Sequence, residues 1–184
     1  MRRRVLAGIA VLVVVVVTFS LLGAIFFLDL SSYTASGSQT LNPSGPSVGR
    51  ALVVYDPGLS GAAQKAAQMV AQDLQQKGYV VDLAGVKSSA ASNLSGYGII
   101  VAGGPMYFGQ ATSSIDDFLN GVGPQQNAKL GVFVTTGNSQ VVGSDEQMLQ
   151  RQVASATTHP VSIEMILLGS EDQNCADLVA NLTK

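Results

Sequence analysis

The segment from Gly98 to Gly109 constrains the fold of this chain more than any other. It reads Gly-Ile-Ile-Val-Ala-Gly-Gly-Pro-Met-Tyr-Phe-Gly, an apolar run that stops at two glycines. An uninterrupted apolar run predicts a strand covered on both faces, as in a parallel sheet. Ligands of open α/β sheets bind in the loops after such strands. Two interpretations of the Tyr107-Phe108 pair are open: the rings stack on a flat ligand, or they close the top of the core.

Strands and helices alternate along residues 50–184. Five strands are predicted, at 51–55, 79–83, 98–102, 130–135 and 161–168. Apolar residues at helical spacing predict helices around 63–74, 115–122, 148–153 and 175–182, whereas 84–96 is too weakly periodic to predict a helix. Strands separated by helices imply right-handed crossovers, which predict a doubly wound, five-stranded parallel sheet in the order 2-1-3-4-5.

The amino terminus predicts one transmembrane helix. Arg2, Arg3 and Arg4 precede the uncharged run Val5–Leu28, and the next basic residue is Arg50. As a helix the run is roughly 36 Å long, enough to cross a hydrocarbon core of about 30 Å. Cleaved signal peptides have shorter apolar regions of about 7–15 residues, so an uncleaved anchor over residues 1–28 is favoured. The positive-inside rule places the amino terminus in the cytoplasm and the remainder outside it.

Residues 29–49 separate this anchor from the domain. They are rich in Ser, Gly, Thr and Pro and offer little to bury, which predicts a flexible linker without helix or strand. Residues 50–184 then form one domain of ordinary size.

Composition narrows the function classes for this domain. Its seven basic and eleven acidic residues give a net charge of about −4 without a basic cluster, which argues against nucleic-acid binding. Cys175 is the only cysteine, so no internal disulfide forms, and no Cys/His set predicts a metal site. Cys175 falls on an apolar helical stripe, and His159 precedes a proline at a turn. These positions favour a buried structural thiol and a loop histidine, and we predict no catalytic residues.

Two triplets match the N-glycosylation acceptor pattern. They are Asn93-Leu-Ser95 and Asn181-Leu-Thr183. A domain outside the cytoplasm makes such triplets relevant, and Asn93 is the stronger candidate.

Three segments that follow the first, third and fourth strands of the domain resemble the flavodoxin family, and the resemblance covers essentially all of residues 50–184. The family's first loop has the form Thr/Ser-x-Thr-Gly-Asn-Thr. The corresponding segments here are Gly58-Leu59-Ser60-Gly61-Ala62-Ala63, Pro105-Met106-Tyr107-Phe108-Gly109 and Thr135-Thr136-Gly137-Asn138. The resemblance implies a flavodoxin-like fold and a flavin mononucleotide (FMN) cofactor. The phosphate of FMN would lie on the first segment, and its ring between the other two.

Some features of the segment Gly58–Ala63 favour an anion site and others do not. Helix amino termini present unpaired N–H groups and the positive end of the helix dipole, which favour a phosphate. Ser60 and Gly61 keep the family pattern, whereas Gly58, Ala62 and Ala63 lack its hydroxyl or amide side chains. Because parallel strands end at one edge, we also expect Ser60, Tyr107 and Thr136 to lie at the same edge of the sheet.

The resemblance and the predicted anchor lead to three alternatives for function. The first is a membrane-tethered electron carrier that binds FMN and exchanges electrons with a redox protein partner. The second is a binding or scaffold module that keeps the fold and has lost FMN. The third and weakest is an FMN-dependent quinone reductase.

Overall fold

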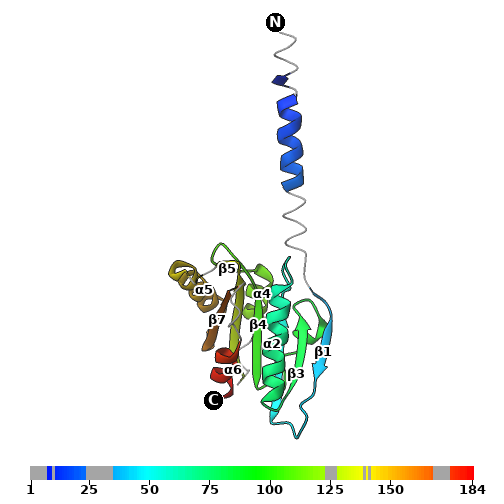
Figure 1. The fold of residues 1–184 in the computed structure, drawn as a ribbon, viewed down its shortest axis with the longest axis vertical. Helices are drawn as coiled ribbons and strands as arrows, with labels where there is room; N and C mark the ends of the chain where they lie inside the picture. The colour runs from blue at the N-terminus through cyan, green and yellow to red at the C-terminus, as the bar shows by residue number, and fades with distance from the viewer. Residues whose placement is uncertain are drawn as a thin grey trace. The chain divides into compact units, whose positions relative to one another are not determined.

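Five parallel strands form the centre of the sheet within the described part of the chain (Figure 1). The strands are β2 (Gly49–Tyr55), β3 (Tyr79–Gly85), β4 (Ile99–Tyr107), β6 (Lys129–Thr136) and β7 (Val161–Leu167). They lie in the order β3-β2-β4-β6-β7, so the predicted order 2-1-3-4-5 is confirmed. The structure is a computed structural model that describes residues 8–9, 11–23, 35–122, 128–138, 140, 142–167 and 175–184.

Two short strands complete the seven-stranded sheet of the described residues. β1 (Ser38–Leu41) pairs antiparallel with β3, and β5 (Gln110–Ala111) forms a hairpin with the end of β4. The prediction of a linker without a strand over 29–49 is therefore wrong for 38–41. β1 covers the edge of β3, whose backbone groups would otherwise be unpaired, and its Leu41 packs against the core. Four residues with mainly exposed side chains carry too weak a pattern to predict this strand.

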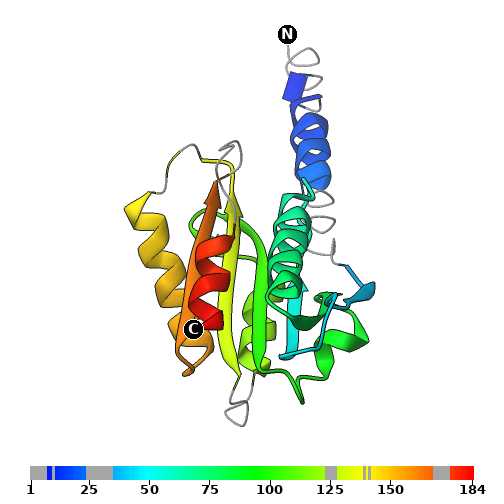
Figure 2. The same cartoon turned by 60° about the horizontal axis from the view of Figure 1, so that its bottom comes forward.

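Helices cover both faces of the sheet (Figure 2). They are α2 (Ala62–Gln76), α3 (Ser89–Ser92), α4 (Ser113–Gly121), α5 (Gly143–Ala156) and α6 (Ala176–Thr183). One core contains α2, α6 and alternate residues of β2 such as Val53, and the other contains α3, α4, α5 and the intervening residues such as Leu52. The doubly wound prediction is confirmed. So is the burial of Cys175, which is the N-cap residue of α6.

The amino-terminal unit is described separately from this sheet. The chain divides into Met1–Tyr33 and Thr34–Lys184, and residues 11–23 are helical with exposed side chains. No helix among the described residues is both long and apolar enough to cross a membrane. The predicted anchor Val5–Leu28 lies partly outside the described residues, so the anchor stays a prediction.

Phe133 packs on Gly103 of the adjacent strand, within the core that also contains residues of α2 and α6. Phe133 on β6 is fully buried, and it pairs in register with Gly103 on β4. A Cβ atom on Gly103 would lie 2.1 Å from the Cε1 and Cζ atoms of the Phe133 ring. The ring therefore occupies the space that a larger residue at position 103 would need.

We expect Gly103→Ala to destabilise the protein, because the new methyl group overlaps the Phe133 ring. Overpacking of this kind costs about 1–3 kcal/mol in free energy of unfolding, measured by urea denaturation. Gly98→Ala is the matched control, since its Cβ would meet only the Arg50 carbonyl oxygen, at 3.9 Å. Equal stability of the two variants would contradict this account of the core.

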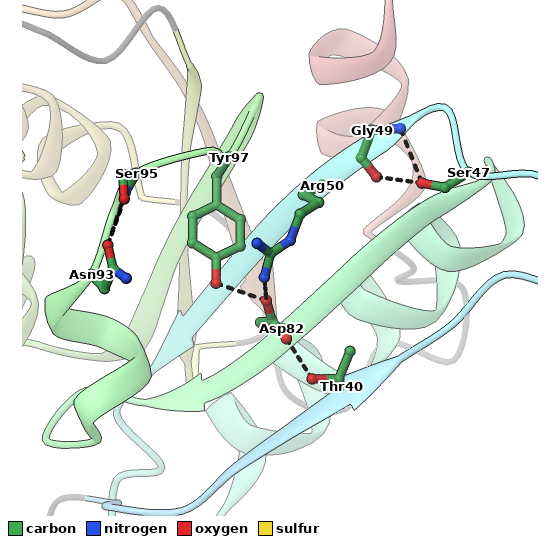
Figure 3. A network of polar contacts seen from close by, with 8 residues as sticks. All are labelled: Thr40, Ser47, Gly49, Arg50, Asp82, Asn93, Ser95 and Tyr97. Atoms are coloured by element: carbon green, nitrogen blue, oxygen red, sulfur yellow. Dashed lines mark hydrogen bonds and ion pairs between the residues drawn. The ribbon is translucent and has the colours of Figure 1, made fainter.

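A polar cluster stabilises the β1 side of the sheet (Figure 3). Asp82 on β3 is buried, and it accepts hydrogen bonds from Thr40 Oγ1 at 2.5 Å and from Tyr97 Oη and Arg50 Nη2 at 2.7 Å each. The Arg50 guanidinium also lies over the Tyr97 ring, 4.8 Å from its centroid. Burial raises the pKa of Asp82, but the hydrogen bonds from Thr40, Tyr97 and Arg50 outweigh burial and leave this pKa below its ordinary value.

We expect the Asp82 cluster to make stability depend on pH. A lowered carboxyl pKa contributes stability above the ordinary carboxyl pKa, and this contribution is lost as the pH falls through the lowered value. Thr40→Val should therefore cost about 1 kcal/mol at pH 7, less than the about 1.5–3 kcal/mol of a bond to a charged group, because Thr40 is exposed. Urea unfolding should show this cost shrinking below about pH 4. Thr40→Ser keeps the hydroxyl and should behave like the wild type. If the loss of unfolding free energy in Thr40→Val does not change with pH, the hydrogen bond to the Asp82 carboxylate is not its cause.

Candidate functional site

The loops after β2, β4 and β6 meet at one edge of the sheet. In the register, Tyr55 pairs with Gly103 and Gly103 with Phe133, so the three strands end side by side. The loop residue Gly58 is held against β4, since a Cβ atom on it would lie 2.7 Å from Pro105 Cγ. The prediction that Ser60, Tyr107 and Thr136 lie at the same edge is confirmed.

The first loop contains a buried carboxyl group that sequence reasoning missed. Asp56 follows β2 directly and is 5% exposed. Its Oδ1 accepts the Gly58 N–H at 3.0 Å, while Oδ2 accepts the hydroxyls of Thr112, at 3.0 Å, and Ser114. Asp56 therefore ties this loop to the start of α4 and occupies one of its backbone donors. A charged residue directly after the apolar strand Ala51–Tyr55 is the signal that would have pointed to it.

The rest of the first loop leaves the amino terminus of α2 open. Gly61 is the N-cap residue with φ 68°, so the N-cap position has no side chain to cap the helix, and no acidic residue lies in its first turn. Ser60 Oγ accepts the Ala62 N–H at 3.3 Å. Backbone N–H groups at such a terminus attract anions. The loop thus offers backbone donors and the Ser60 hydroxyl.

The second predicted loop is instead a β-hairpin. The strand predicted over 98–102 continues through the two glycines, because β4 pairs with β6 as far as Pro105–Thr135. Met106 and Tyr107 then pair with Ala111 and Gln110 of β5. The two-residue turn between them is Phe108-Gly109, with φ values of 53° and 79°. Positive φ at both positions is typical of a type I′ turn, which favours Asn-Gly.

Contacts with α5 hold this hairpin in place. The Gln152 side chain accepts the Ala111 N–H at 2.8 Å and donates to the Ala111 carbonyl at 3.1 Å, as a neighbouring strand would. A Cβ atom on Gly109 would lie 2.2 Å from Met148 Cε. The tip itself is uncovered, since Tyr107 is 38% and Phe108 99% exposed. The hairpin therefore presents two aromatic side chains at the carboxyl edge of the sheet.

The third segment runs from the end of β6 into solvent. Thr135 and Thr136 are buried, and Thr136 Oγ1 accepts the Asn138 N–H at 3.3 Å. Gly137 and Asn138 are exposed, and Asn138 Nδ2 donates to Asp145 on α5 at 3.3 Å. Gly137 and Asn138 are thus the accessible part of this segment.

Exposure divides the predicted cofactor-binding residues into two sets. A ligand can reach Leu59, Ser60, Gly61, Ala62, Tyr107, Phe108, Gly137 and Asn138, which are exposed or partly exposed. The buried set is Gly58, Ala63, Pro105, Met106, Gly109, Thr135 and Thr136. These buried residues position the accessible set.

Other groups singled out in the sequence lie elsewhere. The backbone N–H of His159 donates to Thr157 Oγ1 at 3.2 Å in the turn between α5 and β7. No group of three or more His, Cys, Asp or Glu side chains in the described residues is arranged to hold a metal ion.

Solved structures of several proteins are similar to this fold. Rubredoxin oxygen:oxidoreductase from Desulfovibrio gigas matches with a TM-score of 0.55 at 17% identity, over 75% of this chain and 35% of its own length. Flavodoxin 2 from Bacillus cereus matches with a TM-score of 0.52 at 14% identity, over 73% of this chain and 97% of its own. The apo form of the NADH:FMN oxidoreductase EmoB matches with a TM-score of 0.53 at 14% identity, over 74% of this chain and 87% of its own.

The fold is flavodoxin-like. At these identities the likeness extends to the fold alone. No protein-family model matches the chain, and no curated protein sequence does either.

We expect Phe108→Asn to stabilise the protein. Phe108 adopts a left-handed backbone conformation with an exposed ring, a combination that costs of order 1 kcal/mol, whereas asparagine suits this turn position. The free energy of unfolding should rise by about 0.5–1 kcal/mol. Tyr107→Asn, at a strand position with negative φ, should give no such gain. A Phe108→Asn variant less stable than wild type would show that the ring makes stabilising contacts.

Proposed function

We propose that the carboxyl edge of the sheet binds FMN and that the protein exchanges electrons with a redox protein partner. The observation that carries the proposal is the meeting of a helix amino terminus with glycine as its N-cap residue and an exposed aromatic hairpin at one edge of a flavodoxin-like sheet. An FMN molecule has an anionic phosphate at one end and a flat ring at the other. The two features suit those two ends.

The accessible residues fit FMN through backbone donors and aromatic rings. The N–H groups that open α2 and the Ser60 hydroxyl would hold the phosphate. Tyr107 and Phe108 would lie against the ring on one side, and Gly137-Asn138 on the other. When bound, the flavin supplies the redox chemistry, while the chain binds and orients it and limits its contact with water. The exposed Phe108 strains the backbone, and strained positions of this kind cluster at ligand sites.

Asp56 should weaken the hold on the phosphate. Its carboxyl group is buried in the same loop, and it occupies the Gly58 N–H. Ala62 and Ala63 add no side-chain donors. The ring end of the ligand should therefore supply a larger share of the affinity than the phosphate end.

Titration with FMN and riboflavin, followed by flavin fluorescence quenching, tests the proposal. The purified full chain should quench both flavins, and Phe108→Asn should weaken both while leaving the protein folded. Asp56→Asn should tighten FMN binding by about tenfold and change riboflavin binding little, because removing one nearby charge affects only the phosphate. Asp117→Asn removes an exposed charge of α4 and serves as the control.

Two results would contradict these expectations. An Asp56→Asn variant that tightens riboflavin as much as FMN would mean that Asp56 acts on the shape of the loop. A wild type that quenches neither flavin would favour the second candidate, a binding module without a cofactor. Asp56 and the two alanines favour that candidate, in which the exposed Phe108 would contact a partner protein.

We propose further that residues 1–28 anchor the protein in a membrane with the domain outside the cytoplasm. The described residues 11–23 are helical and largely apolar, and their side chains are exposed. The cluster Arg2–Arg4 before the run favours a cytoplasmic amino terminus. A redox partner of the domain would then be a membrane or extracytoplasmic protein.

A further inference from the structure

The two glycosylation triplets lie in different local structures. Asn93 follows α3 with an extended backbone, at φ −110° and ψ 97°, and its side chain is exposed. Asn181 lies inside α6, whose Leu182 is buried in the core. A modifying enzyme has to bind the whole triplet in its own active site. The first triplet is available in the folded protein, whereas the second would require part of α6 to unwind.

The hydrogen bonds of the first triplet leave its nucleophilic atom accessible. Asn93 Oδ1 accepts the Ser95 hydroxyl at 2.7 Å and the Ser95 N–H at 3.3 Å. Figure 3 shows Asn93 Nδ2 pointing away from Ser95, and Nδ2 has no hydrogen-bond partner among the described residues. The asparagine and the hydroxyl of the acceptor pattern are thus adjacent, with the amide nitrogen facing outward.

The hydrogen bonds of the second triplet belong to its helix. Thr183 Oγ1 donates to the Val179 carbonyl at 2.8 Å, and Asn181 Oδ1 accepts from Lys184 Nζ at 2.8 Å. The hydroxyl is therefore directed along α6 and away from the asparagine amide.

From this contrast we infer that Asn93 is an N-linked glycan acceptor and that Asn181 is not. The inference rests on the proposed location of the domain outside the cytoplasm. The co-substrate is an oligosaccharide linked to a polyprenyl pyrophosphate. A bond forms between sugar C1 and Asn93 Nδ2, the C1–O bond to the pyrophosphate breaks, Nδ2 loses one proton, and the lipid pyrophosphate leaves.

Asn93 lies outside the three segments that form the candidate flavin site. Asn93 lies on the connection between β3 and β4, which also carries Tyr97 of the Asp82 cluster. The candidate site is built from the segments after β2, β4 and β6 instead.

Synthesis of the full chain with endoplasmic-reticulum microsomes tests the inference. The readout is a gel shift that an endoglycosidase reverses. We expect one glycan on the wild type and on Asn181→Gln, and none on Asn93→Gln or Ser95→Ala. Gln140→Thr creates the triplet Asn138-Ser-Thr at an exposed asparagine and reports the location of the domain. This variant should carry two glycans.

Each other outcome overturns a defined part of the inference. If Gln140→Thr carries one glycan, and the double variant with Asn93→Gln still carries it, then Asn93 is not an acceptor. A glycan lost in Asn181→Gln would show that α6 does not protect the second triplet. Absence of any glycan on Gln140→Thr would overturn both the location and the modification. The FMN proposal would stand in that case, because the flavin titration tests it separately.

Discussion

The contact between the Phe133 ring and Gly103 is the constraint on which the other parts of the structure depend. It places Phe133, the bulkiest fully buried side chain among the described residues, on the backbone of the adjacent strand at the centre of the sheet. Because β4 and β6 are paired through this contact and beyond it, the segments that follow them emerge side by side. The candidate site is therefore positioned by the core, and its loops add only local detail.

Two features of this edge work in opposite directions. The open terminus of α2 and the Phe108 hairpin create a surface suited to an anionic ligand with a flat ring. Asp56 joins the first loop to the start of α4, but it occupies the Gly58 N–H and adds a carboxyl group to that loop. Such a site would depend more on aromatic contact than on phosphate contact, and it would be less selective for phosphorylated flavins.

Sequence patterns predicted the central strands, their order and the helices that cover them, because those elements bury regular apolar faces. The sequence patterns failed where pairing with a distant strand outweighs the conformational preference of the residues themselves. Ser38–Leu41 is a strand because β3 offers an unpaired edge, and β4 continues through its glycines because β6 pairs with it. The three segments of the candidate site were predicted correctly to lie at one edge. Which of their residues are accessible depends on packing between distant parts of the chain, which no sequence pattern displays.

The sequence by itself determined the layered α/β arrangement and the convergence of strand ends, since both follow from apolar periodicity and crossover handedness. It also revealed both glycosylation triplets. Only the tertiary structure decided that Asp56 is buried with three donors, that Phe108 is exposed on a strained turn, and that Asn93 lies on an extended segment whereas Asn181 lies in a helix. These properties depend on which distant residues meet in space, and neighbouring residues in the chain carry no information about that.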